Sequence, residues 1–335
     1  MVNAKELLNS KGYDFLKEGD LDNRIAFLTL AGSISYGTDI FNDSYQSDTD
    51  VRGVFLHTRE EILNCRPTSQ TIENKDVDAL LYPLGKMVHL LKNCNPDVLP
   101  LLGVKKEHIL KISPEGKLLV DNADLFLSKK AGNSFGGYAM QQLNLIEEAM
   151  SVEGCTDEEA ITRRLKRRLD EQMEYFALNY TGLSKDECFK VSSRDALSRD
   201  ELCITIDLRD YPVKSLRGMF SELANIEKDF GKLRKRNKKS TPTKLAKHQM
   251  HLIRLLTMGT EILSGEGINT FREKDRGFLL DIRNEKYTNE EIMEFVRQKE
   301  AEFNYAKKYT NLPDTCDYKA VDELVCEINL MSLNK

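Results

Sequence analysis

The chain has 335 residues, a formal net charge of −5 and an isoelectric point near 5.7. Its length allows a catalytic domain plus a second domain, and its acidic balance excludes a globally basic nucleic-acid-binding protein. The seven cysteines are scattered and form no C-x-x-C pair, which disfavours a disulfide framework or a zinc finger and indicates a reducing compartment. The sequence contains no signal-peptide core and no apolar run near membrane-spanning length, so we expect a soluble, cytoplasmic protein without membrane contact.

The first predicted elements are a helix, a buried strand and a glycine-rich turn. Residues 3–18 carry apolar residues at helical spacing, and residues 25–31 form an apolar run typical of a buried strand. The next stretch, Gly32-Ser33-Ile34-Ser35-Tyr36-Gly37-Thr38, combines glycines with small hydroxyl residues. This composition predicts a turn rather than a strand or a stable helix interior, and the backbone N–H groups of such a turn suit a triphosphate.

A second strand is predicted over residues 49–56, with two aspartates at its start. Because side chains alternate between the faces of a strand, Asp48 and Asp50 are expected to project from one face. Two adjacent carboxylates repel each other unless a cation lies between them, and Mg²⁺ is a hard cation that prefers oxygen ligands. Arg52 is expected on the same face, and we weigh equally its roles as an ion-pair partner of the aspartates and as a phosphate contact.

A further carboxylate is expected from the next strand-like run, residues 76–82. A third acid helps to bind a catalytic metal and to deprotonate an attacking hydroxyl group. Asp76 and Asp78 share a face of this run, and both are candidates.

The rest of the chain is predicted to be mostly helical. Thr58 is expected to cap a short helix, residues 83–93 show helical spacing, and residues 103–117 are rich in turns. Further helices are expected over residues 292–309 and 320–331, which gives an α+β or mixed α/β fold. We place the domain boundary near residue 130, with a catalytic domain over 1–130 and a mostly helical domain over 131–335.

One helix of the second part, within residues 244–256, carries a polar stripe. His248, His251 and Arg254 are three residues apart and therefore lie near one face, and Lys247 extends that face. The stripe is expected to line a site or, as the second choice, a domain interface. A dedicated zinc site is disfavoured because no cysteine or clear third ligand is nearby.

These motifs together resemble the DNA polymerase beta nucleotidyltransferase superfamily, in which a strand and Gly-Ser are followed by Asp-x-Asp on the next strand. The longer pattern here is similar to one branch, the RNA-repair-pathway polymerase beta family of predicted nucleotidyltransferases. The residues that carry this resemblance are Gly32-Ser33-x-x-Tyr36-Gly37-Thr38 and Ser47-Asp48-x-Asp50-x-Arg52-Gly53-Val54. Residues 247–256 and 278–287 also resemble segments of this family, although Asn284 stands where the family usually has glycine.

The resemblance implies an α+β fold with a small mixed β-sheet nucleotidyltransferase core and a C-terminal helical domain. It implies transfer of a nucleoside monophosphate from an NTP, such as ATP, to a hydroxyl acceptor, with release of pyrophosphate. The family's name implies an RNA end, tRNA-like, as the acceptor in RNA repair or modification, and RNA-repair enzymes as partners. The family also places an acid before the pattern that begins at Tyr82, which favours Asp78 over Asp76.

The resemblance also implies the composition of the site. Two Mg²⁺ ions, or Mn²⁺ in their place, would be bound by Asp48, Asp50 and Asp78. The implied nucleotide contacts come from the glycine-rich motif, the second strand and the polar helix: Gly32, Ser33, Tyr36, Gly37, Thr38, Arg52, Lys247, His251 and Arg254.

The acceptor is the least constrained part of this interpretation. Two basic runs, residues 163–168 and 232–239, suit a phosphate backbone, with Arg234, Lys235 and Arg236 as candidate contacts, but charge runs are more often solvated surface. One alternative is a nucleotidyltransferase that modifies a protein or a small molecule. Another is a non-catalytic nucleotide-binding regulator, which we disfavour because every expected metal ligand is present.

Overall fold

A computed structural model describes residues 4–42, 45–68, 70–151 and 242–334, and within 152–241 it describes two short strands and a few isolated residues. The chain divides into two compact units, one of Met1–Leu143 with Ala246–Lys335 and the other of Asn144–Leu245. The second unit contains a two-stranded antiparallel sheet, β8 (Phe189–Ser193) and β9 (Leu202–Ile206). The domain boundary near residue 130 stays a prediction, because compactness is a different property from independent folding.

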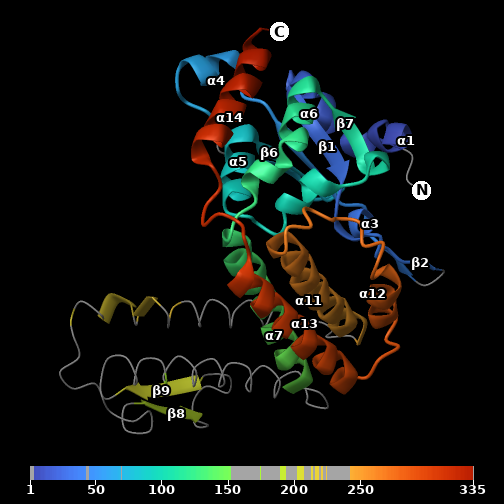
Figure 1. The fold of residues 1–335 in the computed structure, drawn as a ribbon, viewed down its shortest axis with the longest axis vertical. Helices are drawn as coiled ribbons and strands as arrows, with labels where there is room; N and C mark the ends of the chain where they lie inside the picture. The colour runs from blue at the N-terminus through green and yellow to red at the C-terminus, as the bar shows by residue number, and fades with distance from the viewer. Residues whose placement is uncertain are drawn as a thin grey trace. The chain divides into compact units, whose positions relative to one another are not determined.

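The first unit is built on a five-stranded mixed sheet (Figure 1). The strand order is β5-β6-β4-β1-β7, where β4 and β6 are parallel and all other neighbours are antiparallel. The strands are β1 (Ile25–Leu30), β4 (Val51–Phe55), β5 (Ile72–Asn74), β6 (Ala79–Pro83) and β7 (Ile109–Ile112). A small mixed sheet followed by C-terminal helices confirms the predicted α+β class.

Two strands differ from the sequence-based expectation. The second strand of the motif begins at Val51, so Asp48 and Asp50 precede it instead of opening it. Residues 109–112 were expected to lie in a turn-rich stretch, but they form β7, an edge strand that pairs with β1 after the 3₁₀ helix η3 (Lys106–His108). A four-residue edge strand with a lysine in it leaves too short an alternation to be recognised in the sequence.

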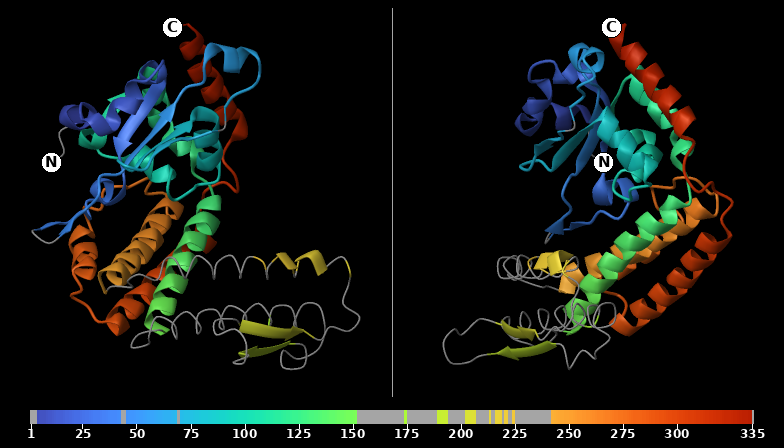
Figure 2. Two further views of the ribbon diagram at one scale, coloured as in Figure 1. Left: turned by 180° about the vertical axis from the view of Figure 1, so that it is seen from behind. Right: turned by 90° about the vertical axis from the view of Figure 1, so that its left-hand side faces the viewer.

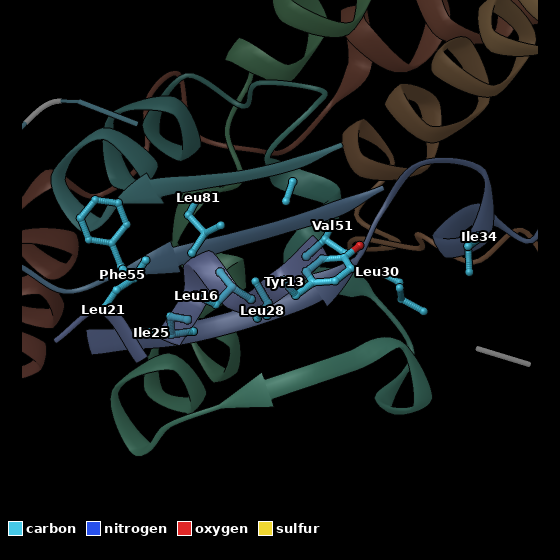
Figure 3. Packing of buried hydrophobic residues seen from close by; sticks show 11 residues of the cluster. Tyr13, Leu16, Leu21, Ile25, Leu28, Leu30, Ile34, Val51, Phe55 and Leu81 are labelled. Carbon is cyan, nitrogen blue, oxygen red and sulfur yellow. The ribbon is translucent and has the colours of Figure 1, made fainter. Parts of the chain in front are cut away.

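One face of the sheet packs against the N-terminal segment. Tyr13 and Leu16 pack there against side chains of β1, β4 and β6, including Val51 and Leu81 (Figure 3). The covering elements are α1 (Ala4–Leu8), the 3₁₀ helix η1 (Lys11–Lys17) and α2 (Leu21–Arg24). The single helix expected over residues 3–18 is therefore split between Leu8 and Lys11, and the second piece, which contains Gly12, is a 3₁₀ helix. Glycine weakens an α-helix interior.

The other face is covered by α5 (Leu84–Lys92) and α6 (Pro114–Asp121), as the right-hand view of Figure 2 shows. The last helix, α14 (Tyr318–Leu333), packs on α6, on α4 (Arg59–Leu63) and on the 3₁₀ helix η4 (Ala123–Phe126). Thr58 caps α4 with a reciprocal hydrogen-bond pair to Glu61, as expected from its position. A further 3₁₀ helix, η2 (Leu99–Gly103), follows α5.

The remaining helices, which lie wholly or mostly in the first unit, form a bundle next to the sheet (Figure 1). They are α7 (Lys130–Ser151), α11 (Pro242–Leu263), α12 (Arg276–Arg283) and α13 (Asn289–Tyr309). Phe135 of α7 and Phe303 of α13 are buried and meet at Gly259 of α11, where a Cβ atom would lie 2.6 Å from the Phe303 ring. No helix in the described part of the chain is long and apolar enough to cross a membrane.

Candidate active site

The glycine-rich motif forms a one-turn helix, α3 (Gly32–Tyr36), where the sequence predicted a turn. Gly37 ends it in the left-handed region, with φ at 73°. Gly32 also has a positive φ, 58°, and a Cβ atom there would lie 1.7 Å from Oδ2 of Asp50. Only glycine therefore lets the Asp50 carboxylate lie directly against this backbone.

The parallel pairing of β4 with β6 brings two of the predicted carboxylates together. Val51 is in register with Ala79, and the N–H group of Val51 donates to the carbonyl oxygen of Asp78 at 3.1 Å. Asp50 and Asp78 each stand immediately before these paired residues, so their side chains emerge at the same edge of the sheet.

Arg52 connects the two carboxylates. Its Nη2 atom lies 3.0 Å from Oδ1 of Asp78 and 3.6 Å from Oδ1 of Asp50, and its Nη1 atom donates to the carbonyl oxygen of Asp78 at 2.6 Å. This arrangement matches the ion-pair role considered for Arg52. Its side chain remains 23% exposed, so the guanidinium is also accessible to a ligand.

The electrostatics of the two carboxylates are linked. Burial, together with the hydrogen bond to Asp78 and the charge of that residue, raises the pKa of Asp50 to about 6. Burial opposes the ionisation of Asp78 too, but the hydrogen bond with Asp50 and the charge of Arg52 lower the pKa of Asp78 overall. The pair therefore shares a proton in mildly acidic solution, which shows that two full negative charges are costly at this position.

The donor chemistry of this pair fits a hard divalent cation, because carboxylate oxygens are the preferred ligands of Mg²⁺. Asp48 is exposed, and the described residues contain no group of three or more carboxylate, imidazole or thiol side chains that is close enough to hold a metal ion. The structure thus brings Asp50 and Asp78 together and leaves Asp48 outside the pair.

Asp76, the alternative third carboxylate, has a different environment. It lies in the turn between β5 and β6, where its N–H group donates to the side chain of Asn74 at 3.0 Å. Asp78 has a positive φ of 44°, an uncommon conformation for a residue other than glycine. The structure therefore places Asp78, and not Asp76, beside Asp50.

The end of the glycine-rich motif is held by arginines from the C-terminal part. The Nε atom of Arg276 donates to the carbonyl oxygen of Gly37 at 2.6 Å. The backbone N–H group of Arg272 donates to the carbonyl oxygen of Tyr36 at 3.1 Å. Thr38 is fully buried, and its carbonyl oxygen accepts a hydrogen bond from Arg283. These contacts position the motif around Ser33, whose own side chain is half-buried.

The three arginines were not predicted as site residues. The resemblance at residues 278–287 included Arg283 without giving it a role, and Arg272 and Arg276 lie outside any motif. Arg283 also reaches Oγ of Ser47, at 3.3 Å, and so links α12 to both ends of the loop between the two motifs. Sequence spacing carries no signal for such contacts, because they join segments more than 200 residues apart.

The polar face of α11 lies near the carboxylates. Lys247 is exposed, and its charge contributes to lowering the pKa values of both Asp50 and Asp78. Burial and the neighbouring cations, first among them Arg254, hold the pKa of His251 well below its usual range, so this imidazole is neutral. The remaining histidine of the stripe, His248, bonds to the side chain of Gln142 at 2.8 Å.

Arg254 is a buried cation next to the glycine-rich motif. Its guanidinium carbon lies 3.7 Å from the centre of the Tyr36 ring, and its Nη2 atom lies 3.3 Å from Nδ1 of His251. The side chain is 6% exposed, its Nε atom has no hydrogen-bond partner, and no carboxylate of the described residues pairs with it. A buried guanidinium without a counter-ion is costly, which marks this position as favourable for an anion.

The basic residues predicted to contact nucleic acid, Arg234, Lys235 and Arg236, lie outside the described residues, as does the run at 163–168.

Comparison with known proteins gives one match. Residues 11–200 match the family model described as the RNA repair pathway DNA polymerase beta family. No curated protein and no solved structure matches the chain. Because the matched residues make up more than half of the chain, it belongs to this family of polymerase beta-like nucleotidyltransferases.

Proposed function

We propose that this protein transfers a nucleoside monophosphate from an NTP to a hydroxyl group at an RNA end and releases pyrophosphate. The observation that carries the proposal is the convergence of Asp50 and Asp78 at one edge of the sheet, with Asp50 against the backbone of Gly32. Two carboxylates at the edge of a sheet, beside a glycine-rich loop, form the core of a metal-dependent phosphoryl-transfer site.

The carboxylate pair and the residues around it would bind different groups: the metal ions, the terminal phosphates and the rest of the triphosphate. Asp50 and Asp78 would hold Mg²⁺ or Mn²⁺, which supplies charge neutralisation for the attacking and leaving oxygens. Asp48, which is exposed and outside the pair, would become a third ligand only after its side chain turns toward them. The backbone of Gly32 and the hydroxyl group of Ser33 hold the terminal phosphates. Lys247 and Arg254 offer positive charge to the rest of the triphosphate, and no carboxylate of the described residues competes with an anion for Arg254.

The RNA acceptor and any RNA-repair partner enzymes are supported by the description of the matched family. Chemistry at the carboxylate pair is the same for any hydroxyl acceptor, so the acceptor must be identified by experiment. Each of the four α-labelled NTPs is incubated with the protein, Mg²⁺ and a mixture of RNA and protein, and the labelled product is then treated separately with ribonuclease and with protease.

We expect label that ribonuclease releases, with wild-type protein and with Asp76→Asn, and no label with Asp50→Asn. Asp76→Asn is the matched control because Asp76 lies two residues from Asp78 but outside the pair. Label that only protease releases would show that the acceptor is a protein. NTP binding without transfer to any acceptor would instead identify a non-catalytic regulator.

A further inference from the structure

The loop between the glycine-rich motif and Asp48 is a hairpin with a closed base. Its strands, β2 (Phe41–Asn42) and β3 (Tyr45–Gln46), pair antiparallel. At the base, the backbone N–H group of Ser47 donates to the carbonyl oxygen of Ile40, and the N–H group of Ile40 donates to Oγ of Ser47, both at 2.9 Å. Ser47 is 3% exposed, so this end of the hairpin is also buried.

Arg283 joins the two ends of the hairpin from a third segment of the chain. It is the last residue of α12, which lies beside the hairpin (Figure 1). Its Nη1 atom donates to the carbonyl oxygen of Thr38, ahead of the hairpin, and its Nη2 atom donates to Oγ of Ser47, behind it, at 3.3 Å. Arg283 is itself buried. Because the donors of a guanidinium lie in one rigid plane, Arg283 fixes Thr38 and Ser47 relative to each other.

Asp48 follows directly after this clamped serine. Two residues further along, the backbone of Asp50 is held as well, because the N–H group of Ala31 donates to its carbonyl oxygen at 2.8 Å. Only Asp48 and Thr49 lie between Ser47 and Asp50, which leaves the backbone of Asp48 little freedom. Any approach of its exposed side chain to the carboxylate pair is therefore a rotation of that side chain, and not a rearrangement of the loop.

This difference matters for metal binding because ordering a ligand costs free energy. A ligand whose backbone is already in place loses only side-chain freedom when it binds an ion, whereas a ligand on a loose loop loses backbone freedom too. Hydrogen-bonding groups that orient metal ligands commonly contribute roughly 10- to 100-fold to metal affinity.

We propose that Arg283 is a positioning residue that holds Ser47 and thereby presents Asp48 as the third ligand of the divalent cation bound by Asp50 and Asp78. Arg283 acts through Ser47 and contacts neither the cation nor the substrate. This inference rests on the proposed metal-dependent function and adds the residue that places the third carboxylate.

The test is a double-mutant cycle on the affinity for Mn²⁺, measured without NTP from the electron paramagnetic resonance signal of free Mn²⁺. Its four proteins are wild type, Ser47→Ala, Asp48→Asn and the double variant. Ser47→Ala removes the oxygen that accepts from Arg283 but leaves the bond of Arg283 to Thr38. We expect each single substitution to raise the dissociation constant of Mn²⁺ by about tenfold or more. The double variant should stay within about twofold of Asp48→Asn, because the position of residue 48 no longer matters once its carboxylate is gone.

Arg283→Met tests the arginine itself, and Arg24→Met is its matched control. Arg24 also donates to a backbone carbonyl oxygen, that of Leu56 at 3.1 Å, but at the end of β4 that is remote from Asp50. We expect Arg283→Met to raise the dissociation constant of Mn²⁺ as Ser47→Ala does, and Arg24→Met to keep the wild-type value even where its melting temperature falls. If Arg283→Met does not fold, the Ser47→Ala cycle carries the test alone.

The inference is overturned if wild type binds no Mn²⁺, or if either Asp48→Asn or Ser47→Ala binds it as tightly as wild type. It is also overturned if the two effects multiply in the double variant, because independent effects are the mark of a structural role alone. Failure of the proposed function gives a different result, namely a cycle with the expected dissociation constants in a protein that transfers no label from any NTP.

Discussion

The Nη2 atom of Arg52 lies 3.0 Å from Oδ1 of Asp78, and the same atom lies 3.6 Å from the carboxylate of Asp50. A single guanidinium group thus pairs with both carboxylates that converge at the edge of the sheet and offsets part of their charge. It holds the pair together and, at the same time, competes with any divalent cation for the same oxygens.

The first prediction follows from this competition. Arg52→Gln removes the guanidinium charge, so we expect the dissociation constant of Mn²⁺, measured by calorimetry, to fall severalfold while transfer activity decreases. Arg59→Gln is the control, because Arg59 contacts the carbonyl oxygen of Leu333 and not the carboxylates. Unchanged Mn²⁺ affinity in Arg52→Gln would mean that Arg52 does not limit access of the cation to the pair.

The second prediction concerns pH. The pKa of Asp50 is raised to about 6, so the folded state holds this proton more tightly than the unfolded chain does. The resulting stability is fully present below about pH 4 and is lost as the pH rises through 6. Without metal at pH 7.5, Asp50→Asn should therefore be more stable than wild type by roughly 1–3 kcal/mol, since the lowered pKa of Asp78 offsets part of the effect.

Urea unfolding at pH 4 and at pH 7.5 measures this difference. The gap between the two proteins should close near pH 4, and at pH 7.5 Mg²⁺ should stabilise wild type but not Asp50→Asn. A gap of the same size at both pH values would mean that another property of the substitution, and not the ionisation of Asp50, sets the stability.

The third prediction uses two glycines with nearly the same backbone conformation. Gly32 and Gly19 have φ values of 58° and 56°, but a Cβ atom meets Asp50 at Gly32 and meets nothing within 4 Å at Gly19. Gly19→Ala should cost about 1 kcal/mol of stability and leave activity unchanged. Gly32→Ala carries the same strain and also displaces Asp50, so we expect its kcat to fall about 100-fold. Equal kcat in the two variants would argue against the close approach of Asp50 to this backbone.

The fourth prediction compares two buried arginines. Arg272 is 2% exposed and pairs with Glu261 at 2.6 Å and with Asp275 at 2.9 Å, whereas Arg254 is buried and pairs with no carboxylate in the described part of the chain. Removing Arg272 leaves two partly buried anions without their partner, so Arg272→Met should destabilise the protein by about 3 kcal/mol. Arg254→Met removes a buried charge that no carboxylate of the described residues pairs with, and it loses a cation–π contact of about 2 kcal/mol together with the contacts to His251 and Met258. These effects offset each other, so stability should stay close to that of wild type.

The same Arg254→Met variant should bind NTP at least about tenfold more weakly, because it loses a charge-assisted contact to phosphate. Thermal unfolding and NTP titration measure the two effects separately. If Arg254→Met lost stability but bound NTP normally, Arg254 would have a structural role only.

The predictable part of the site is the part that depends on local spacing. The strand before Gly32 and the carboxylates around the second strand could be read from the sequence, because apolar runs and the position of Asp50 beside a strand are local properties. The choice between Asp76 and Asp78 depends on the register of β4 against β6, which no local pattern determines. Arg276 holds Gly37 from 239 residues away, so its role emerges only in the folded chain.

In the fold, too, features set by local sequence could be predicted and features set by long-range pairing could not. The helix that follows Thr58 could be predicted from its capping residue together with its first turn. The edge strand β7 could not, because its residues are stabilised by pairing with β1 and carry little periodicity of their own. The burial of Arg254 away from every described carboxylate is likewise a property of packing that the sequence does not contain.

The measurement that tests the central claim most directly is the rate of Mg²⁺-dependent transfer from an α-labelled NTP in Asp78→Asn, compared with Asp76→Asn. The two residues are equivalent in charge and lie on the same turn, but only Asp78 stands beside Asp50. We predict that Asp78→Asn loses at least about 1000-fold in kcat, as expected for loss of a metal ligand, and that Asp76→Asn retains wild-type activity. Full activity in Asp78→Asn would contradict the assignment of the Asp50–Asp78 pair as the catalytic centre.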